Sequence, residues 1–207
     1  MLYLASQSPR RQSLLKELQV AFDLLLPEAH EDTESLEEVL PSEAALDYVR
    51  RVTLLKLEAA VKRLERKGLE WAPILCADTT VAIRQGSSDL ILGKPVDSYD
   101  ALQMLTLLNH QCHDVHTAIA LQIHPHQPPE CLVSSSKVFF ADHCVEKLQA
   151  YVATHEPMGK AGAYAIQGLG GALIAKIEGS HSSIMGLPLY ETSVLLEKAG
   201  ITYILYP

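Results

Sequence analysis

Two consecutive arginines, Arg10 and Arg11, follow a serine and a proline near the start of the chain. A short apolar strand is expected up to Ala5, and Ser8 and Pro9 have the residue types that favour a helix N-cap and the first helical position. The exposed N–H groups make a helix start partly positive, so cations there strengthen a positive site instead of neutralising one. A bound anion, phosphate in particular, explains the pair. Two solvated surface arginines are the alternative.

Four further charged side chains have types suited to phosphate chemistry. Asp78 follows four apolar residues and is expected at the end of a buried strand, where ligand sites of open α/β sheets lie, although a turn-capping aspartate is also common. Lys94 stands on a rigid Gly-Lys-Pro bend that lacks the spacing of a Walker loop. Lys56 is expected in mid-helix, where a solvated lysine is the alternative. Glu31 lies in an acidic run that is either a solvated face or turns one carboxylate toward a divalent ion.

The amide of Gln167 lies in a glycine-rich stretch, residues 165–171. Glycines allow another group to approach the backbone closely, and one amide offers both a donor and an acceptor. Uracil and thymine present acceptors on either side of an N–H donor, so such an amide could pair with them. The spacing of His110, His113 and His116 does not match a zinc site, because in a strand it places neighbours on opposite faces.

The composition is that of one globular unit, which we expect to form two lobes over residues 1–207. The chain has 48% hydrophobic and 20% charged residues, and its formal net charge is −8. This acidic balance argues against a nucleic-acid polymer as partner. The four cysteines are scattered without a disulfide framework, which predicts reduced thiols and a cytoplasmic protein. The sequence contains no pattern of a signal peptide or a membrane span.

Alternating segments predict a mixed α/β sheet rather than a purely doubly wound one. Helices are expected after Pro9, from Ser42 as N-cap to Gly68, and over about 98–108, 145–152 and 192–198. Strands are expected over about 22–26, 74–77, 115–123, 131–140 and 201–205, with a hairpin turning at 86–89.

Taken together, these segments resemble the Maf family of nucleoside triphosphate pyrophosphatases. Five blocks in order carry the resemblance and span nearly the whole chain, and each of them is modest alone. They are residues 6–11 (SQSPRR), 77–79 (ADT), 92–97 (LGKPVD), 156–168 (EPMGKAGAYAIQG), and 179–180 (GS) followed by 186–189 (GLPL).

The resemblance implies hydrolysis of a nucleoside triphosphate between its α and β phosphates, with Mg²⁺ or Mn²⁺, to the monophosphate and pyrophosphate. Asp78 matches the acidic residue at the family's catalytic position, which is expected to accept a proton from water and to bind the metal. Glu31 matches an acidic residue near the metal. Five further residues match positions of the family that face the phosphates, namely Ser6, Arg10, Arg11, Lys56 and Lys94. The implied fold is an elongated mixed sheet in two lobes with a central cleft, as in inosine-triphosphate pyrophosphatases, and a homodimer is expected.

Three positions separate the branches of this family. The branch acting on dTTP and UTP has Arg10, Thr79 and Gln167, whereas the branch acting on 7-methyl-GTP has Trp, Gln and Glu there. A tryptophan would stack on the cationic methylated base, so this chain is expected to prefer pyrimidines. A 7-methyl-GTP pyrophosphatase and a non-catalytic nucleotide-binding regulator of septation are the alternatives. The chain departs from the family pattern at residues 109–112 and at Gly159, which could alter loop shape or selectivity.

Overall fold

A computed structural model describes residues 1–28, 31–32, 35–86 and 88–206. The α-helices of this part of the chain are α1 (Pro9–Glu17), α2 (Ala45–Arg66), α3 (Ser98–Leu108), α4 (Val145–Ala153), α5 (His181–Met185) and α6 (Leu189–Lys198). Its strands are β1 (Leu2–Leu4), β2 (Phe22–Leu24), β3 (Ile74–Gln85), β4 (Ser88–Leu92), β5 (Cys112–Gln122), β6 (Glu130–Phe140) and β7 (Ile174–Glu178). Short 3₁₀ turns are η1 (Ser35–Glu37), η2 (Ala161–Ala163) and η3 (Leu169–Leu173).

The strands form one mixed sheet in the order β2-β1-β3-β5-β6-β7, with β4 added beside β3. β1 pairs in parallel with β2 and β3, while the β3–β5, β5–β6, β6–β7 and β3–β4 pairs are antiparallel. The prediction of a mixed α/β sheet flanked by helices is therefore confirmed.

The edge of β3 that faces away from β5 is only partly covered. β1 pairs with Ile74 and Leu75, and β4 pairs with β3 only from Val81 onward. On the opposite edge, β5 pairs with β3 without interruption from Ile74 to Ala82. The stretch from Cys76 to Thr80 therefore runs between the end of β1 and the end of β4, with no described strand beside it on that edge.

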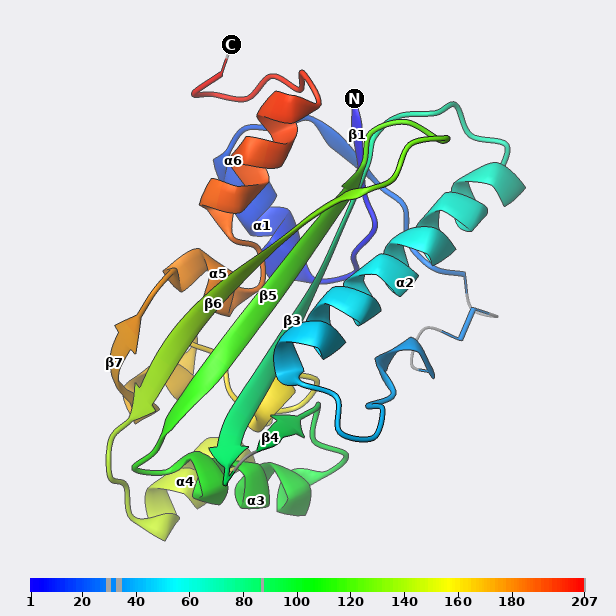
Figure 1. Ribbon diagram of the computed structural model, residues 1–207. Coiled ribbons are helices and arrows are strands. Elements are labelled where there is room, and N and C mark those ends of the chain that lie inside the picture. Colours follow the sequence, from blue (N-terminus) through cyan, green and yellow to red (C-terminus); the bar gives the residue numbers. More distant parts are fainter. Residues whose placement is uncertain (29–30, 33–34, 87, 207) are drawn as a thin grey trace.

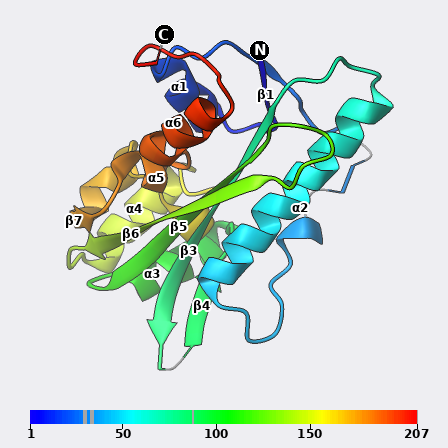
Figure 2. The same ribbon diagram turned by 45° about the horizontal axis from the view of Figure 1, so that its top comes forward.

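Helices cover the two faces of the sheet unequally (Figures 1 and 2). The long helix α2 lies across one face, where Leu57, Ala60 and Leu64 pack against Tyr3, Ile74 and Cys76. On the other face two apolar clusters follow one another along β3. One contains Ala77 with residues of α1 and α6, and the other contains Val81 with residues of α3 and α4.

Thr79 lies between Ala77 and Val81 on that second face, and Asp78 points to the face covered by α2, because successive strand side chains alternate. The uncovered stretch of β3 thus coincides with the gap between the two apolar clusters. A ligand that enters here reaches side chains from both faces of the sheet.

Several predicted elements differ from the structure. Asp78 lies inside β3, not at its end, because β5 keeps the strand paired past the polar residues. Helix α2 begins at Ala45 with Ala44 as its N-cap, while Ser42 adopts a turn with φ of 60°. Ser8 is the N-cap of α1 as predicted, but its side chain does not make the capping hydrogen bond.

The strand predicted over 201–205 is also wrong. This segment is a turn that closes with a single bridge between Tyr203 and Tyr206. Ile201 and Tyr203 pack into the cluster that contains residues of α1 and α6, whereas Ile204 and Leu205 are exposed. The Ile204 N–H donates to the Leu18 carbonyl. The predicted helix at 192–198 begins earlier, at Leu189.

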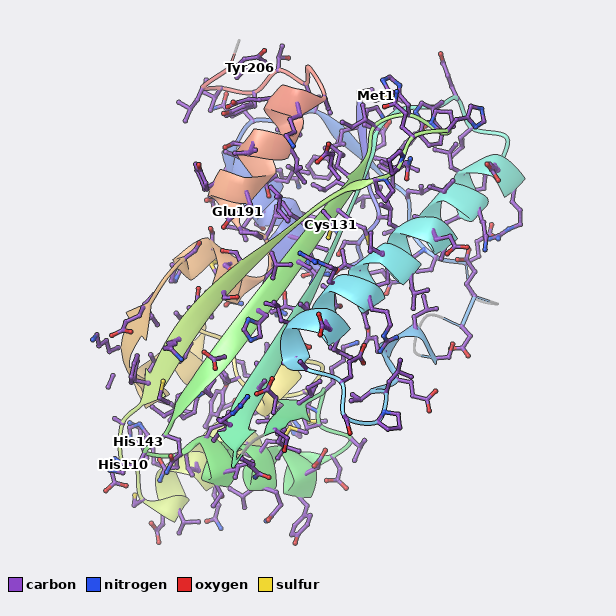
Figure 3. The ribbon with its side chains drawn as sticks, in the orientation of Figure 1. Met1, His110, Cys131, His143, Glu191 and Tyr206 are labelled. Carbon is purple, nitrogen blue, oxygen red and sulfur yellow. The ribbon has the colours of Figure 1, made fainter. Side chains whose placement is uncertain are left out.

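The departure at residues 109–112 lies at the end of the molecule opposite Met1 and Tyr206, where Figure 3 shows His110 and His143 close together. Asn109 donates to the carbonyl of His143 at 2.9 Å and accepts from its N–H at 3.1 Å. This segment therefore joins α3 to α4. Among the described residues, no helix is long and apolar enough to cross a membrane.

Candidate functional site: a charged cleft at the open edge of β3

A cavity of about 420 Å³ opens at the uncovered stretch of β3. This volume is within the range of small-molecule sites, roughly 300–1,000 Å³. The cavity is lined by eight of the nine predicted site residues: Ser6, Arg10, Arg11, Lys56, Asp78, Thr79, Lys94 and Gln167. They come from the end of β1, the start of α1, the middle of α2 and β3, the bend after β4 and the loop before η3.

Carboxylates and ammonium groups alternate on the α2 side of this cavity. Lys56 donates to Asp78 Oδ1 at 2.5 Å and to Glu37 Oε1 at 2.7 Å. Lys94 donates to the other oxygen of Glu37, also at 2.7 Å. Glu37 thus links two lysines that come from different elements, and Lys56 links two carboxylates.

Burial and charge have opposite effects on the pKa values in this row. Burial lowers the pKa of Lys56, but Asp78 and Glu37 outweigh it and leave that pKa above its ordinary value. Burial raises the pKa of Glu37, but Lys56 and Lys94 outweigh it and leave that pKa below its ordinary value. Lys56 and Glu37 are therefore both charged near neutral pH.

The opposite part of the cavity has cations that form no ion pair among the described residues. Arg10 and Arg11 occupy the first turn of α1, and Lys160 approaches them from the segment before η2. Burial and the neighbouring Arg11 lower the pKa of Arg10, while burial and Arg10 lower the pKa of Lys160. Lys160 donates to the backbone carbonyl of Glu156, which carries no full charge. This mutual repulsion favours an anion between the three cations.

Neutral acceptors orient Arg11. Its Nε donates to the Gly186 carbonyl at 2.8 Å, Nη1 to Ser6 Oγ at 3.4 Å and Nη2 to Thr79 Oγ1 at 3.3 Å. The Thr79 hydroxyl also lies 3.0 Å from that of Thr117 on β5. Arg11 is thereby fixed against β3 while its charge is left for a ligand.

Gln167 lies at the exposed rim of the cavity, in the loop between η2 and η3. Its side-chain amide has no hydrogen-bond partner among the described residues, so both its donor and its acceptor are available. Gly159, one of the departures from the family pattern, also lines the cavity and has φ of 72°, a conformation that favours glycine.

Glu31 is the one predicted site residue that the structure places elsewhere. Its carboxylate binds Arg63 Nε and Nη2, at 2.9 and 2.6 Å, and Arg66 Nη2 at 2.7 Å. The hydrogen bond from Arg63 is the main cause of a Glu31 pKa of about 2. Arg63 lines the cavity, whereas Glu31 does not belong to the lining residues that the structure describes. These contacts favour a structural role for Glu31, and its predicted part in metal binding stays a prediction.

Sequence reasoning missed three charged residues of the cavity, Glu37, Arg63 and Lys160. Glu37 belongs to the same acidic run as Glu31, and nothing in the local pattern distinguishes the one that reaches the lysines. Lys160 belongs to one of the motif blocks, yet a solvated lysine and a cavity lysine have the same local sequence. Only the folded structure shows that these residues line the cavity.

The donor set fits a magnesium or manganese ion. Asp78 and Glu37 each place an oxygen within 2.7 Å of Lys56 Nζ, so the two carboxylates lie on the same side of the cavity. No group of three or more acidic, histidine or cysteine ligands occurs among the described residues. One or two carboxylates plus substrate phosphates is the usual binding mode of Mg²⁺ in phosphate-handling sites.

The mixed α/β sheet places a cationic cavity beside a buried aspartate, and this charge distribution suits a polyanion next to carboxylates. Residues 1–199 match the model of the Maf-like protein family. The chain belongs to the Maf family.

Curated relatives are similar over nearly the full length. A "dTTP/UTP pyrophosphatase" of Albidiferax ferrireducens is 51% identical over 199 residues, covering 96% of each chain. One of Burkholderia orbicola is 52% identical over 202 residues, covering 98% of this chain and 94% of the relative. Among solved structures, the Staphylococcus aureus Ham1 protein aligns with a TM-score of 0.44 and 13% identity, over 68% of this chain and 72% of that chain.

Proposed function

We propose that this chain hydrolyses dTTP and UTP to the nucleoside monophosphate and pyrophosphate. One observation carries the proposal: Asp78 meets Arg10, Arg11 and Lys160, which form no ion pair within the part of the chain that the structure describes, in one cavity at the open edge of β3. The relatives from Albidiferax ferrireducens and Burkholderia orbicola are both named dTTP/UTP pyrophosphatase, which supports this substrate pair over 7-methyl-GTP. A non-catalytic regulator would need the cations but not the carboxylate beside them.

In the proposed reaction the triphosphate lies between the cations of α1 and the lysines of the α2 side. Lys56 holds Asp78 through Oδ1, which leaves Oδ2 to accept a proton from a water molecule. The water oxygen attacks the α phosphorus, and the bond from that phosphorus to the oxygen that bridges the α and β phosphates breaks. The pyrophosphate leaves with the negative charge, which Arg10, Arg11 and Lys94 stabilise.

We propose that Asp78 and Glu37 hold the divalent ion, with Glu31 as the competing candidate that the family resemblance implies. The ion would neutralise charge on the phosphate oxygens when bound. Glu37 is supported by its position among the described residues that line the cavity, whereas Glu31 is not among them and its oxygens are bound by two arginines. Glu37→Gln should weaken Mn²⁺ binding measured by electron paramagnetic resonance, with exposed Glu38→Gln as control. If Glu31→Gln weakens Mn²⁺ binding and Glu37→Gln does not, the metal ligand is Glu31 instead of Glu37.

We further propose, from the residues that line the cavity, that Ser6 and Thr79 orient Arg11, and that Arg10, Thr79 and Gln167 select the base. The homodimer, the two-lobed division of the chain and the cytoplasmic location stay predictions from the resemblance and the composition.

A nucleotide panel tests the proposed function. Purified protein with Mg²⁺ or Mn²⁺ should release pyrophosphate from dTTP and UTP faster than from CTP, GTP or 7-methyl-GTP. Asp78→Asn should reduce turnover by about 10²–10⁴-fold, the usual contribution of a general base, while Asp142→Asn at the surface should have no effect. Release of orthophosphate, or no turnover of any nucleotide, would refute the proposal.

A further inference from the structure

The loop that presents Gln167 is anchored by the carboxylate of Glu156. Oε2 of Glu156 accepts from the backbone N–H of Leu169 at 2.9 Å, and Oε1 accepts from that of Gly170 at 3.0 Å. Oε1 also accepts from the hydroxyl of Tyr151 on α4, at 3.0 Å. Both carboxylate oxygens therefore hold the backbone that begins two residues after Gln167.

Two glycines of this loop are required by that anchor. A Cβ at Gly168 would lie 2.5 Å from both carboxylate oxygens of Glu156, and a Cβ at Gly170 would lie 2.6 Å from the Tyr151 hydroxyl. No side chain can occupy those positions while the anchor is in place. The glycines thus allow the loop to close onto the half-buried carboxylate of Glu156. This contact explains the glycine cluster without a bound nucleotide phosphate.

The other end of the loop is fixed by a separate contact. The Tyr164 hydroxyl lies 2.8 Å from His113 Nε2, and the Tyr164 ring packs edge-on against Phe140 with centroids 5.0 Å apart. Tyr164 is buried, whereas Gln167 is exposed at the cavity rim. The backbone that carries Gln167 is therefore fixed on both sides. The side-chain amide of Gln167 itself has no hydrogen-bond partner among the described residues.

We propose that Glu156 is a positioning residue for base selection and acts through Gln167. A bidentate pair between an amide and a base edge needs the amide in one place, because hydrogen bonds weaken steeply with misalignment. Glu156 limits where the Gln167 backbone can lie, and it is not among the described residues that line the cavity. This inference rests on the proposed pyrimidine substrates.

The test compares Glu156→Gln with Glu146→Gln, an exposed position on α4. In Glu156→Gln one oxygen becomes an amide NH₂ group, which cannot accept from the loop N–H groups. We expect the kcat/KM ratio of dTTP to CTP to fall about tenfold, mainly through the KM of dTTP, with no change in Glu146→Gln. Amide hydrogen exchange at Leu169 and Gly170 should accelerate in the first variant alone.

A double variant distinguishes positioning from general destabilisation. If Glu156 acts through Gln167, then adding Glu156→Gln to Gln167→Ala should leave the dTTP-to-CTP ratio where Gln167→Ala alone sets it. Gly168→Ala, which pushes a methyl group against the same carboxylate, should lower the ratio in the same direction. Independent effects in the double variant, or an unchanged ratio in a folded Glu156→Gln protein, would overturn the inference.

The failure of the inference can be told from that of the proposed function. If the unmodified protein turns over neither dTTP nor UTP, the proposed function fails. Calorimetric titration with dTTP and dCTP then still reports whether Glu156→Gln changes the ratio of the two affinities. The same ratio in the unmodified protein and in the variant would refute the positioning role.

Discussion

The ion pair between Glu31 and Arg63 allows a quantitative test of what Glu31 does. Arg63 is 3% exposed, and its guanidinium donates to both oxygens of Glu31 and to the Leu25 carbonyl. Glu31→Gln keeps the size of the side chain but removes the charge. The buried guanidinium then loses its main counterion, while the Leu25 contact remains.

The expected cost follows from this burial. Breaking a buried ion pair by removing one partner costs about 3–5 kcal/mol. We expect the lower end, about 3 kcal/mol, because the Glu31 side chain retains 11% exposure. For a chain of this length that loss lowers the melting temperature by about 6–12 °C.

The effect should also depend on pH. The pKa of Glu31 is about 2 in the folded protein against an ordinary 4.5, so the pair contributes fully above pH 4.5. Its contribution falls as the pH drops from 4.5 toward 2, because the unfolded chain takes up the proton first. Glu31→Gln should therefore differ most from the unmodified protein near neutral pH and least near pH 2.

Urea unfolding from pH 7 down to pH 3 measures this difference, with exposed Glu38→Gln as the matched control. A loss below 1 kcal/mol at pH 7, or a difference that does not shrink on acidification, would refute the structural role. A near-normal stability with strongly reduced Mn²⁺ binding would instead support the metal role that the family resemblance implies.

Three further predictions concern other parts of the fold. Gly162→Ala should destabilise by about 1–3 kcal/mol in urea unfolding, because its Cβ would lie 2.8 Å from Val81 Cγ1 and its φ is 66°; a neutral effect would contradict this packing. Burial lowers the pKa of His113 to about 4, so folding stability should fall from pH 6.5 toward pH 4 as the unfolded chain protonates first, and His113→Leu should flatten that slope. Asp97→Ala should lower stability by about 1 kcal/mol in thermal melts, because the Asp97 side chain caps α3 by accepting from Asp100 N–H at 2.8 Å; unchanged melting would exclude the cap.

Most of the cavity was accessible from the sequence because its residues stand next to local signals. Ser6 follows an apolar strand, the two arginines follow the proline that marks the start of α1, and Lys94 lies on a Gly-Pro bend. Hydrophobic periodicity likewise predicted α3 and the β5–β6 pair. Such features depend on a few neighbouring residues, and the folded chain preserves them.

Only the tertiary structure decided which charges meet. Glu31 and Glu37 belong to one acidic run, yet one binds arginines of α2 and the other reaches two lysines that are 19 and 57 residues away. Asp78 was expected at a strand end, but its environment comes from the gap that β1 and β4 leave along β3. Charge pairing and strand pairing between distant segments are set by the geometry of the whole fold, and local sequence patterns do not encode them.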